Sequence, residues 1–301
     1  MRAGCRPGRW YALAALLTAM LLWGSSFVAM KYAIGSLDPM LVVCVRMVIA
    51  SICFLPFLRS FSRLRPGKKQ VLLLAAMGLC EPCLYFLFEA AALNLTSASQ
   101  ASLITTMLPL LVAVGAALFL GERLTLRIII GLFVAATGAV WLSLAASVSS
   151  HAPHPLLGNF LEFMAMVTAT GYIILLKKLS ADLPPFFMTA AQSVIGAVFF
   201  SLILLITDIH LPVTIPMPAL LSIIYLGTFV SVGAYGLYNF GVSRVPANQA
   251  AAFINLIPLW AVVLGVLLLG EKFTGWQFAA GLLIFAGVMI TQQGKPDQEK
   301  G

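Results

Sequence analysis

Five charged residues lie inside stretches of sequence that are otherwise long and apolar: Lys31, Arg46, Glu81, Glu89 and Glu162. A charged side chain at the centre of a bilayer costs on the order of 2.5–3.5 kcal/mol on insertion scales, so each position needs a physical reason. Carboxylates there can carry protons or contact a cationic solute. A lysine near the end of an apolar segment can instead extend to the lipid headgroups, and we interpret Lys31 as such an anchor.

The acidic residues differ in what their surroundings predict. Glu81, Tyr85 and Glu89 are spaced i, i+4, i+8, which places them on one face of a helix. An acidic, aromatic stripe of this kind suits a water-filled path for a proton or a cationic substrate. Arg46, Glu89 and Glu162 fall at a similar depth, and we predict that Arg46 pairs with Glu89. A structural ion pair and a role in transport both remain open for this pair.

One stretch of the chain occurs twice. Residues 98–125 read ASQASLITTMLPLLVAVGAALFLGERLT, and residues 247–274 read ANQAAAFINLIPLWAVVLGVLLLGEKFT, in one register without a gap. The corresponding residues include Gln100 with Gln249, Pro109 with Pro258, Glu122 with Glu271 and Thr125 with Thr274. A chain that repeats itself at half its length is built from two copies of one unit.

Each copy carries a polar line that runs up to a proline. The lines are Ser99, Ser102 and Thr106 before Pro109, and Asn248, Ala251 and Asn255 before Pro258. A proline inside a helix leaves the carbonyl one turn earlier without its usual donor, and in lipid that group needs protein or cavity water. We predict midplane hinges at the two prolines, with Thr106 and Asn255 at a substrate site. The alternative is packing hydrogen bonds, each worth about 1 kcal/mol or less.

The composition indicates that membrane-spanning helices position these residues. The chain is 61% hydrophobic and 9% charged, against roughly 25% charged residues in a soluble domain. A spanning helix needs about 20 apolar residues. Ten segments qualify, namely 10–33, 39–58, 70–92, 98–120, 126–146, 155–178, 185–207, 217–240, 247–269 and 274–293. The net charge of +8 lies mostly in the short loops, which indicates membrane topology rather than nucleic-acid binding.

The basic residues predict the orientation of these segments. With the N-terminus in the cytoplasm, most of the 18 lysines and arginines fall on the cytoplasmic side, as the positive-inside rule expects. Both termini are then cytoplasmic, and each half of the chain holds five helices. Because five is odd, the second copy is inverted, which is a recurring arrangement in secondary transporters. We expect the repeats to be residues 1–148 and 149–301.

The sequence offers no catalytic constellation. Cys80 and Cys83 form a C-x-x-C, which we interpret as two small apolar residues rather than a metal or redox site because no further ligands are evident. His151 and His154 are two histidines in a loop and carry little weight alone. Nucleotide-binding and hydrolase motifs are absent from the sequence. We therefore expect no enzymatic activity, no cofactor and no metal site.

Several motifs carry a family resemblance. They are LLWGSSFVAMKYA at 21–33, Asp38-Pro39 followed by Arg46, AALNLTSASQASLITTMLPL at 91–110, and the pair LFLGERLT at 118–125 and LLLGEKFT at 267–274. Each is loose alone, but their order and duplication are specific. The chain resembles the drug/metabolite transporter superfamily, in its ten-helix EamA-type branch, over nearly its whole length.

The resemblance implies a fold and a function. The fold is all-α, with ten transmembrane helices arranged as two inverted five-helix repeats and both termini in the cytoplasm. The function is that of a secondary transporter in the plasma membrane, the inner membrane of a bacterium. It moves a small metabolite such as an amino acid by alternating access, as an exporter. Proton coupling through Glu81 or Glu89 and uncoupled transport both remain open, as does the alternative of a non-transporting assembly or lipid-binding partner.

The resemblance also implies which residues form the substrate path. The central cavity is formed by the first, third, fourth, sixth, eighth and ninth segments, with the fifth and tenth at the periphery. On this chain those segments carry Trp23, Ser26, Glu81, Tyr85, Glu89, Thr106, Glu162, Tyr235, Tyr238, Asn239 and Asn255. The sixth segment departs from the family pattern, because Glu162 replaces an apolar residue and Thr170-Gly171-Tyr172 replaces a tryptophan.

Overall fold

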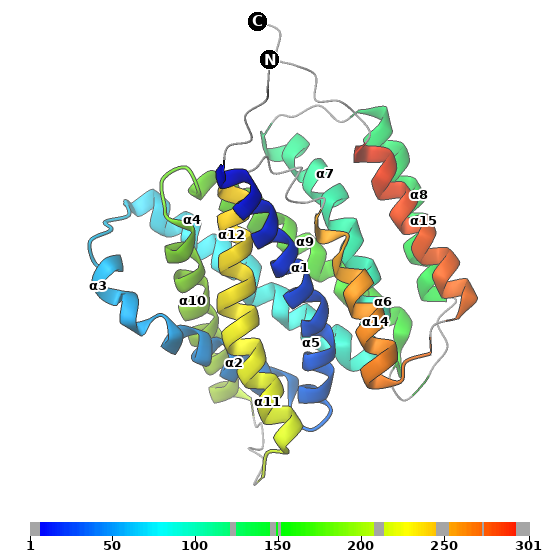
Figure 1. Ribbon diagram of the computed structural model, residues 1–301, viewed down its shortest axis with the longest axis horizontal. Coiled ribbons are helices and arrows are strands. Elements are labelled where there is room, and N and C mark those ends of the chain that lie inside the picture. Colours follow the sequence, from blue (N-terminus) through cyan, green and yellow to red (C-terminus); the bar gives the residue numbers. More distant parts are fainter. Residues whose placement is uncertain are drawn as a thin grey trace, which may run out of the picture.

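The computed structural model describes residues 7–120, 125–144, 149, 152–207, 214–244, 253–272 and 274–292 (Figure 1). Within these ranges eight helical stretches are long and apolar enough to cross a membrane, and two shorter apolar helices follow at Ile257–Leu269 and Gly275–Gly287. The predicted all-α membrane fold of ten helices is confirmed. The repeat residues Glu122, Asn248, Gln249 and Ala251, and also His151, lie outside the described residues.

Six of the ten spans consist of a single described α-helix. These are α1 (Pro7–Ile34), α8 (Leu126–Leu144), α9 (Pro155–Leu179), α10 (Pro185–Ile206), α14 (Ile257–Leu269) and α15 (Gly275–Gln292). The second span is α2 (Pro39–Cys53), continued by η1 (Leu55–Phe57) and α3 (Leu58–Phe61). The start of α2 follows from its sequence, because the Asp38 side chain accepts hydrogen bonds from the Met40 and Leu41 amides and Pro39 occupies the first turn.

The third, fourth and eighth spans change helix type midway. They are α4 (Lys68–Gly78), η2 (Leu79–Leu84) and α5 (Tyr85–Leu95); α6 (Ala98–Ile104), η3 (Thr105–Met107) and α7 (Leu108–Leu120); and α11 (Met217–Tyr225), η4 (Leu226–Ala234) and α12 (Tyr235–Arg244). The elements η2 and η4 are π-helical, and η3 is a 3₁₀-helix. Segments of these types inside α-helices are frequent at functional sites.

The third span corrects a prediction. The sequence pattern predicts one continuous helix over 70–92, but Glu81 has non-helical backbone angles, φ −150° and ψ 118°. The carbonyl of Glu81 accepts a hydrogen bond of 3.1 Å from the Gln192 side chain of α10. A backbone break inside a membrane span is tolerated where protein satisfies the freed groups, and Gln192 does so here.

The two prolines predicted as hinges begin new helical segments. Pro109 follows the 3₁₀ turn of η3 in the first turn of α7, and Pro258 stands in the first turn of α14. Proline is favoured in a first helical turn because its missing N–H has no intrahelical partner there. The breaks lie where they were predicted, and hinge motion at them stays a prediction.

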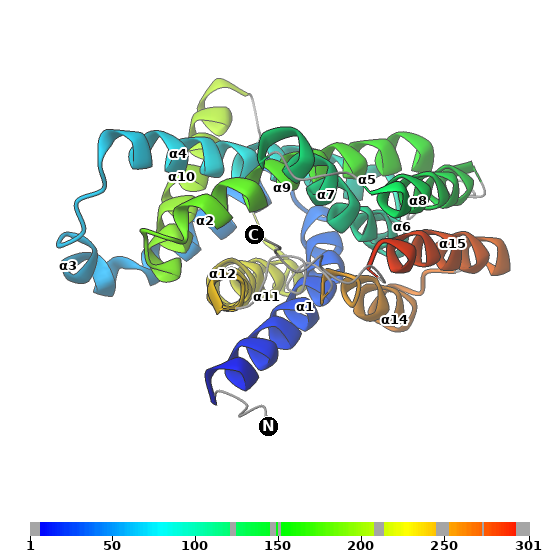
Figure 2. The same ribbon diagram turned by 90° about the horizontal axis from the view of Figure 1, so that it is seen from above.

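The fifth and tenth spans form a pair at the edge of the bundle. Helices α8 and α15 lie side by side at one edge of the bundle (Figures 1 and 2). Their backbones approach closely at Gly138 and Gly287, because a Cβ on Gly287 would lie 2.5 Å from the Ala135 nitrogen. Small residues at these two positions therefore permit the tight contact between the helices.

A carboxylate ties the two halves together at one end of the bundle. Glu271 follows α14, is buried, and accepts hydrogen bonds from the Ala98 amide (2.8 Å), the Ser99 amide (3.0 Å) and the Ser99 hydroxyl (2.5 Å). These donors form the N-terminus of α6, where unpaired amides and the helix dipole favour an anion. Glu271 is therefore a cap that one repeat supplies to the other.

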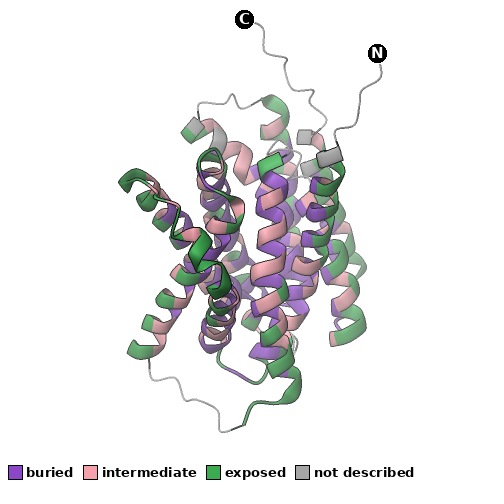
Figure 3. Cartoon of the chain, turned by 60° about the vertical axis from the view of Figure 1, so that its left-hand side comes forward, coloured by how far each residue is buried: buried purple, intermediate pink, exposed green. Residues whose placement is uncertain are grey.

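Burial follows the helix faces. Buried residues gather where helices face one another, and exposed ones cover the outward faces (Figure 3). Many of the exposed side chains are large and apolar, as on Phe119, Phe133 and Leu205, which suits contact with lipid tails. The charged residues Arg46, Glu81, Glu89 and Glu162 are buried.

Candidate functional site

A cavity lies at the centre of the bundle. Its walls come from the first, second, third, fourth, sixth, eighth and ninth spans, so both repeats contribute. The lining residues are Trp23, Ser26, Phe27, Arg46, Glu81, Tyr85, Phe86, Glu89, Thr105, Leu108, Met166, Ala169, Tyr172, Ile173, Val230, Tyr235, Tyr238, Ile254 and Ile257. The spans expected from the family resemblance are all present in the wall, the fifth and tenth spans do not contribute, and Arg46 adds the second.

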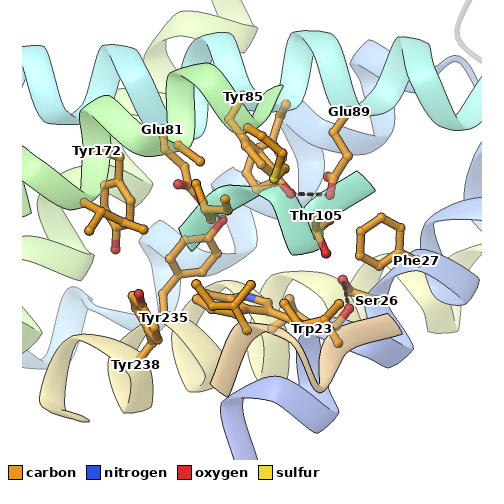
Figure 4. A pocket seen from close by; sticks show the side chains of 18 of the residues that line it. Trp23, Ser26, Phe27, Glu81, Tyr85, Glu89, Thr105, Tyr172, Tyr235 and Tyr238 are labelled. Atoms are coloured by element: carbon orange, nitrogen blue, oxygen red, sulfur yellow. Dashed lines mark hydrogen bonds between the residues drawn. The ribbon is translucent and has the colours of Figure 1, made fainter. Parts of the chain in front are cut away.

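Glu81 enters the cavity from the break in the third span. Its carboxylate accepts a hydrogen bond from the Tyr235 hydroxyl of the second repeat (Figure 4). Glu81 is 6% exposed. A buried acidic group is unfavourable unless it is hydrogen-bonded, so the Tyr235 hydroxyl stabilises it in the low-dielectric interior. The bond also joins the two repeats across the cavity.

Glu89 forms the second acidic position, two turns further along. It accepts a 2.7 Å hydrogen bond from the Tyr85 hydroxyl, and both side chains line the cavity. The predicted acidic stripe therefore reaches the cavity. The helical spacing used to predict it does not hold throughout, because Glu81 precedes α5 in non-helical backbone.

Arg46 supplies the positive group of the cavity wall. Its Nε donates a 3.1 Å hydrogen bond to the Ser231 hydroxyl, and its guanidinium carbon lies 4.3 Å from the centre of the Phe86 ring. This is a cation–π contact in a desolvated site. Arg46 and Glu89 line the same cavity, and Arg46 contacts Ser231 and Phe86. Its direct pairing with Glu89 stays a prediction.

Aromatic rings form the wall opposite the acidic residues (Figure 4). The Trp23 ring lies 4.8 Å from the Tyr238 ring and 5.2 Å from the Tyr235 ring, in tilted and edge-on geometry. Tyr172 lies edge-on to Tyr235 at 6.4 Å. Such pairs stabilise one another beyond their buried area and hold each ring in place. The cavity thus has a preformed aromatic surface.

Four of the predicted path residues do not line this cavity. Thr106 donates to its own helix at the Leu103 carbonyl, and Thr105 takes its place in the wall. Asn239 is committed to other side chains, since it accepts from the Tyr172 hydroxyl at 2.8 Å and donates to Thr189 at 2.8 Å. Asn239 therefore orients Tyr172 from behind the wall.

The other two are Asn255 and Glu162. Asn255 lies in the turn before α14, and its side-chain oxygen is buried without a hydrogen-bond partner among the described residues. Its neighbour Ile254 lines the cavity. Glu162 on α9 is fully buried behind the wall. The remaining seven predicted path residues line the cavity, and their contact with substrate stays a prediction.

Sequence reasoning missed several wall residues. Phe27 follows Trp23 by one helical turn, and Phe86 adjoins Tyr85, so aromatic spacing was the available signal for both. The sequence marks Tyr172 only as part of a departure from the family pattern and not as a wall residue. Thr105 and Ile254 could not be chosen from sequence, because the turns beside Pro109 and Pro258 decide which side chain faces inward.

Comparison with known proteins agrees with the fold. A crystal structure that is 23% identical in sequence superposes with a TM-score of 0.67 and covers 94% of this chain and 96% of its own, which shows the fold alone. The transporter YetK of Bacillus subtilis, which is named as uncharacterized, is 26% identical over 93% of this chain and 86% of its own length.

Two further relatives carry functional names. A "probable amino-acid metabolite efflux pump" of Escherichia coli is 28% identical over 91% of this chain and 92% of its own length. A "probable terminal-alkyne amino-acid exporter" of Streptantibioticus cattleyicolor is 26% identical over 93% and 92%.

The family match repeats along the chain as the sequence does. The model of the EamA-like transporter family matches residues 10–144 and again residues 156–292. Each match covers five of the spans described above, which confirms the duplicated ten-helix arrangement. The placement of the boundary between residues 148 and 149 stays a prediction. The chain is a multi-pass membrane transporter and belongs to the EamA-like transporter family.

Proposed function

We propose that this transporter exports an amino acid or a closely related zwitterionic metabolite across the plasma membrane by alternating access. The observation that carries the proposal is the charge arrangement of the central cavity. Glu81 and Glu89 bring two carboxyl groups to one wall, and Arg46 brings a guanidinium to the same space. A zwitterion presents an ammonium and a carboxylate, which these groups complement.

The chemistry of each wall supports this substrate class. A guanidinium binds a carboxylate in a planar, two-point geometry that an ammonium side chain cannot reproduce. The rings of Trp23, Tyr235 and Tyr238 offer an apolar surface for a substrate side chain and favourable faces for an ammonium group.

The site also has the location that alternating access needs. It lies between the two repeats, with the first repeat supplying Glu81 and Arg46 and the second supplying Tyr235. In carriers built from inverted repeats, one half rocks against the other around a site of this kind. With both termini in the cytoplasm, as predicted, the contact between Glu271 and α6 lies at the outer end of the bundle, away from the cytoplasm.

Export is supported by the names of relatives. Two proteins that align along nearly the whole chain are named as probable exporters or efflux pumps of amino-acid metabolites. Identities of 26–28% are too low to transfer a particular substrate, so the proposal is limited to the class.

Counterflow in liposomes tests the proposal. Purified full-length protein is reconstituted into liposomes that hold one unlabelled amino acid, and entry of the same labelled amino acid is followed for each amino acid in turn. We expect saturable counterflow for at least one of them, and loss of that flux in Glu81→Gln and Arg46→Gln. Lys177→Gln, an exposed residue at the end of α9, is the matched control. Folded wild-type protein with no counterflow for any amino acid would refute the substrate class.

A further inference from the structure

Glu162 is buried without a hydrogen-bond donor. Its side chain is 0% exposed, and neither carboxylate oxygen has a hydrogen-bond partner among the described residues. An isolated ionised carboxylate is very unfavourable in such surroundings, and buried charges in proteins are paired or neutralised. Because the substrate cavity does not reach Glu162, contact with substrate does not explain this residue.

The position of Glu162 along α9 relates it to two polar regions. Residues Asn159, Glu162, Met166 and Ala169 lie on one face of the helix. Met166 and Ala169 line the cavity, whereas Asn159 lies toward the start of α9. Glu162 is therefore about one helical turn from the cavity wall and one turn from Asn159.

Asn159 is the centre of a buried polar network. It accepts a 2.8 Å hydrogen bond from Thr96, and it donates to Gln100 at 3.1 Å and to Ser143 at 3.0 Å. The network joins α9 to the end of α5, the start of α6 and the end of α8. Glu162 therefore lies between the cavity and a polar cluster at the end of the bundle where Glu271 caps α6.

Helix α5 packs along α9 and brings titratable groups near Glu162. Glu89 and Tyr85 both lie on α5, and both interact electrostatically with Glu162. From α6 and α8, the network contributes the polar but non-titratable Gln100 and Ser143. Arg46 of α2 interacts electrostatically with Glu89. Two carboxyl groups in this relationship bind protons as a pair rather than separately.

We propose that Glu162 is a proton-binding site of the carrier and exchanges one proton with Glu89 at the wall of the substrate cavity. The proton leaves the Glu162 carboxyl group and joins the Glu89 carboxylate, so the pair keeps one negative charge in total. Glu89 then presents either a neutral or a charged carboxyl group to the cavity. This exchange would couple proton movement to substrate transport, and that role rests on the transport function proposed above. Proton binding by Glu162 does not depend on it.

Infrared spectroscopy tests proton binding without a substrate. Full-length protein in nanodiscs is compared between neutral and alkaline pH, in H₂O and D₂O. We expect a carbonyl-stretch band of a protonated carboxyl group that is lost in Glu162→Gln and kept, with a shift, in Glu162→Asp. Glu271→Gln is the matched control, because the Glu271 carboxylate already has three hydrogen-bond donors. An unchanged band in folded Glu162→Gln protein overturns the proposal.

Transport measurements then test whether proton binding by Glu162 is coupled to substrate movement. The probe is an amino acid that shows counterflow in the liposome panel, and its accumulation under an imposed pH gradient is compared with its counterflow at equal pH. We expect Glu162→Gln to lower gradient-driven accumulation about tenfold more than counterflow, a typical size for coupling between two sites. Equal loss of both overturns the coupling role. A panel with no transported amino acid refutes the proposed substrate class and leaves the infrared result as the test of Glu162.

Discussion

The hydroxyl of Tyr235 donates a hydrogen bond to the carboxylate of Glu81, and this bond links the second repeat to the broken third span of the first. Because Glu81 is only 6% exposed, the bond satisfies an acidic group that is nearly out of reach of water. The consequence is that a single phenol oxygen supports both the shape of the cavity and its charge.

Removal of this oxygen should weaken the fold. Tyr235→Phe leaves a buried carboxylate oxygen without its donor, so we expect a loss of about 1–3 kcal/mol in the free energy of unfolding. Tyr238→Phe keeps the ring beside Trp23 and the bond to Glu81, and it is the control. Denaturant titration in mixed micelles measures both. Equal effects of the two variants would contradict the role of the bond.

The substitution of Arg46 by lysine should change transport more than stability. Arg46→Lys keeps a positive charge but loses the planar guanidinium that rests on Phe86 and binds Ser231. We expect the half-saturation concentration for a zwitterionic amino acid in counterflow to rise about tenfold, or about 1.4 kcal/mol. Ser231→Ala removes one acceptor and leaves the guanidinium, so its effect should be smaller. An unchanged half-saturation concentration in Arg46→Lys would show that the guanidinium does not contact substrate.

The Glu271 cap should behave as a coupled unit with Ser99. Glu271→Gln loses the negative charge at the N-terminus of α6, and we expect a cost of about 1.5–3 kcal/mol, the range for hydrogen bonds to charged groups. A double-mutant cycle with Ser99→Ala should give a coupling energy of about 0.5–3 kcal/mol in the free energy of unfolding. Additive effects of the two substitutions would argue against the 2.5 Å contact.

The contact between α8 and α15 should not tolerate a methyl group. In Gly287→Ala the new Cβ would lie 2.5 Å from the Ala135 nitrogen and 2.6 Å from the Gly131 carbonyl oxygen. We expect a cost of about 1–3 kcal/mol from overpacking. At Gly236 in α12 a Cβ would meet nothing within 4 Å, so Gly236→Ala should be neutral or stabilise by up to about 1 kcal/mol. The melting temperatures of Gly287→Ala and Gly236→Ala, each compared with that of the wild-type protein, test this difference.

Much of the architecture could be predicted from the sequence. The apolar segments are long, and the repeat is aligned without a gap. These features depend on hydrophobicity and residue size, which act over a whole segment. A local irregularity in the backbone therefore does not disturb the prediction.

The sequence did not predict in the same way which individual side chains face the cavity. The choice of Thr106 assumed an uninterrupted α-helix, but a 3₁₀ turn of about three residues per turn intervenes and brings Thr105 inward instead. Glu81 shows the opposite result, because it reaches the cavity from non-helical backbone. Glu162 lies about one helical turn from the cavity wall, and a predicted depth does not distinguish a wall residue from one directly behind the wall.

The cap on α6 also has a consequence for how the protein is made. Glu271 and the Ala98 amide that it accepts from are 173 residues apart in the chain. At a synthesis rate of about 5–20 residues per second, the ribosome needs roughly 10–35 s to make the intervening chain. During that interval the newly inserted first repeat has an α6 whose leading amides await their acceptor. The first repeat therefore gains this helix cap only when the second repeat is nearly finished.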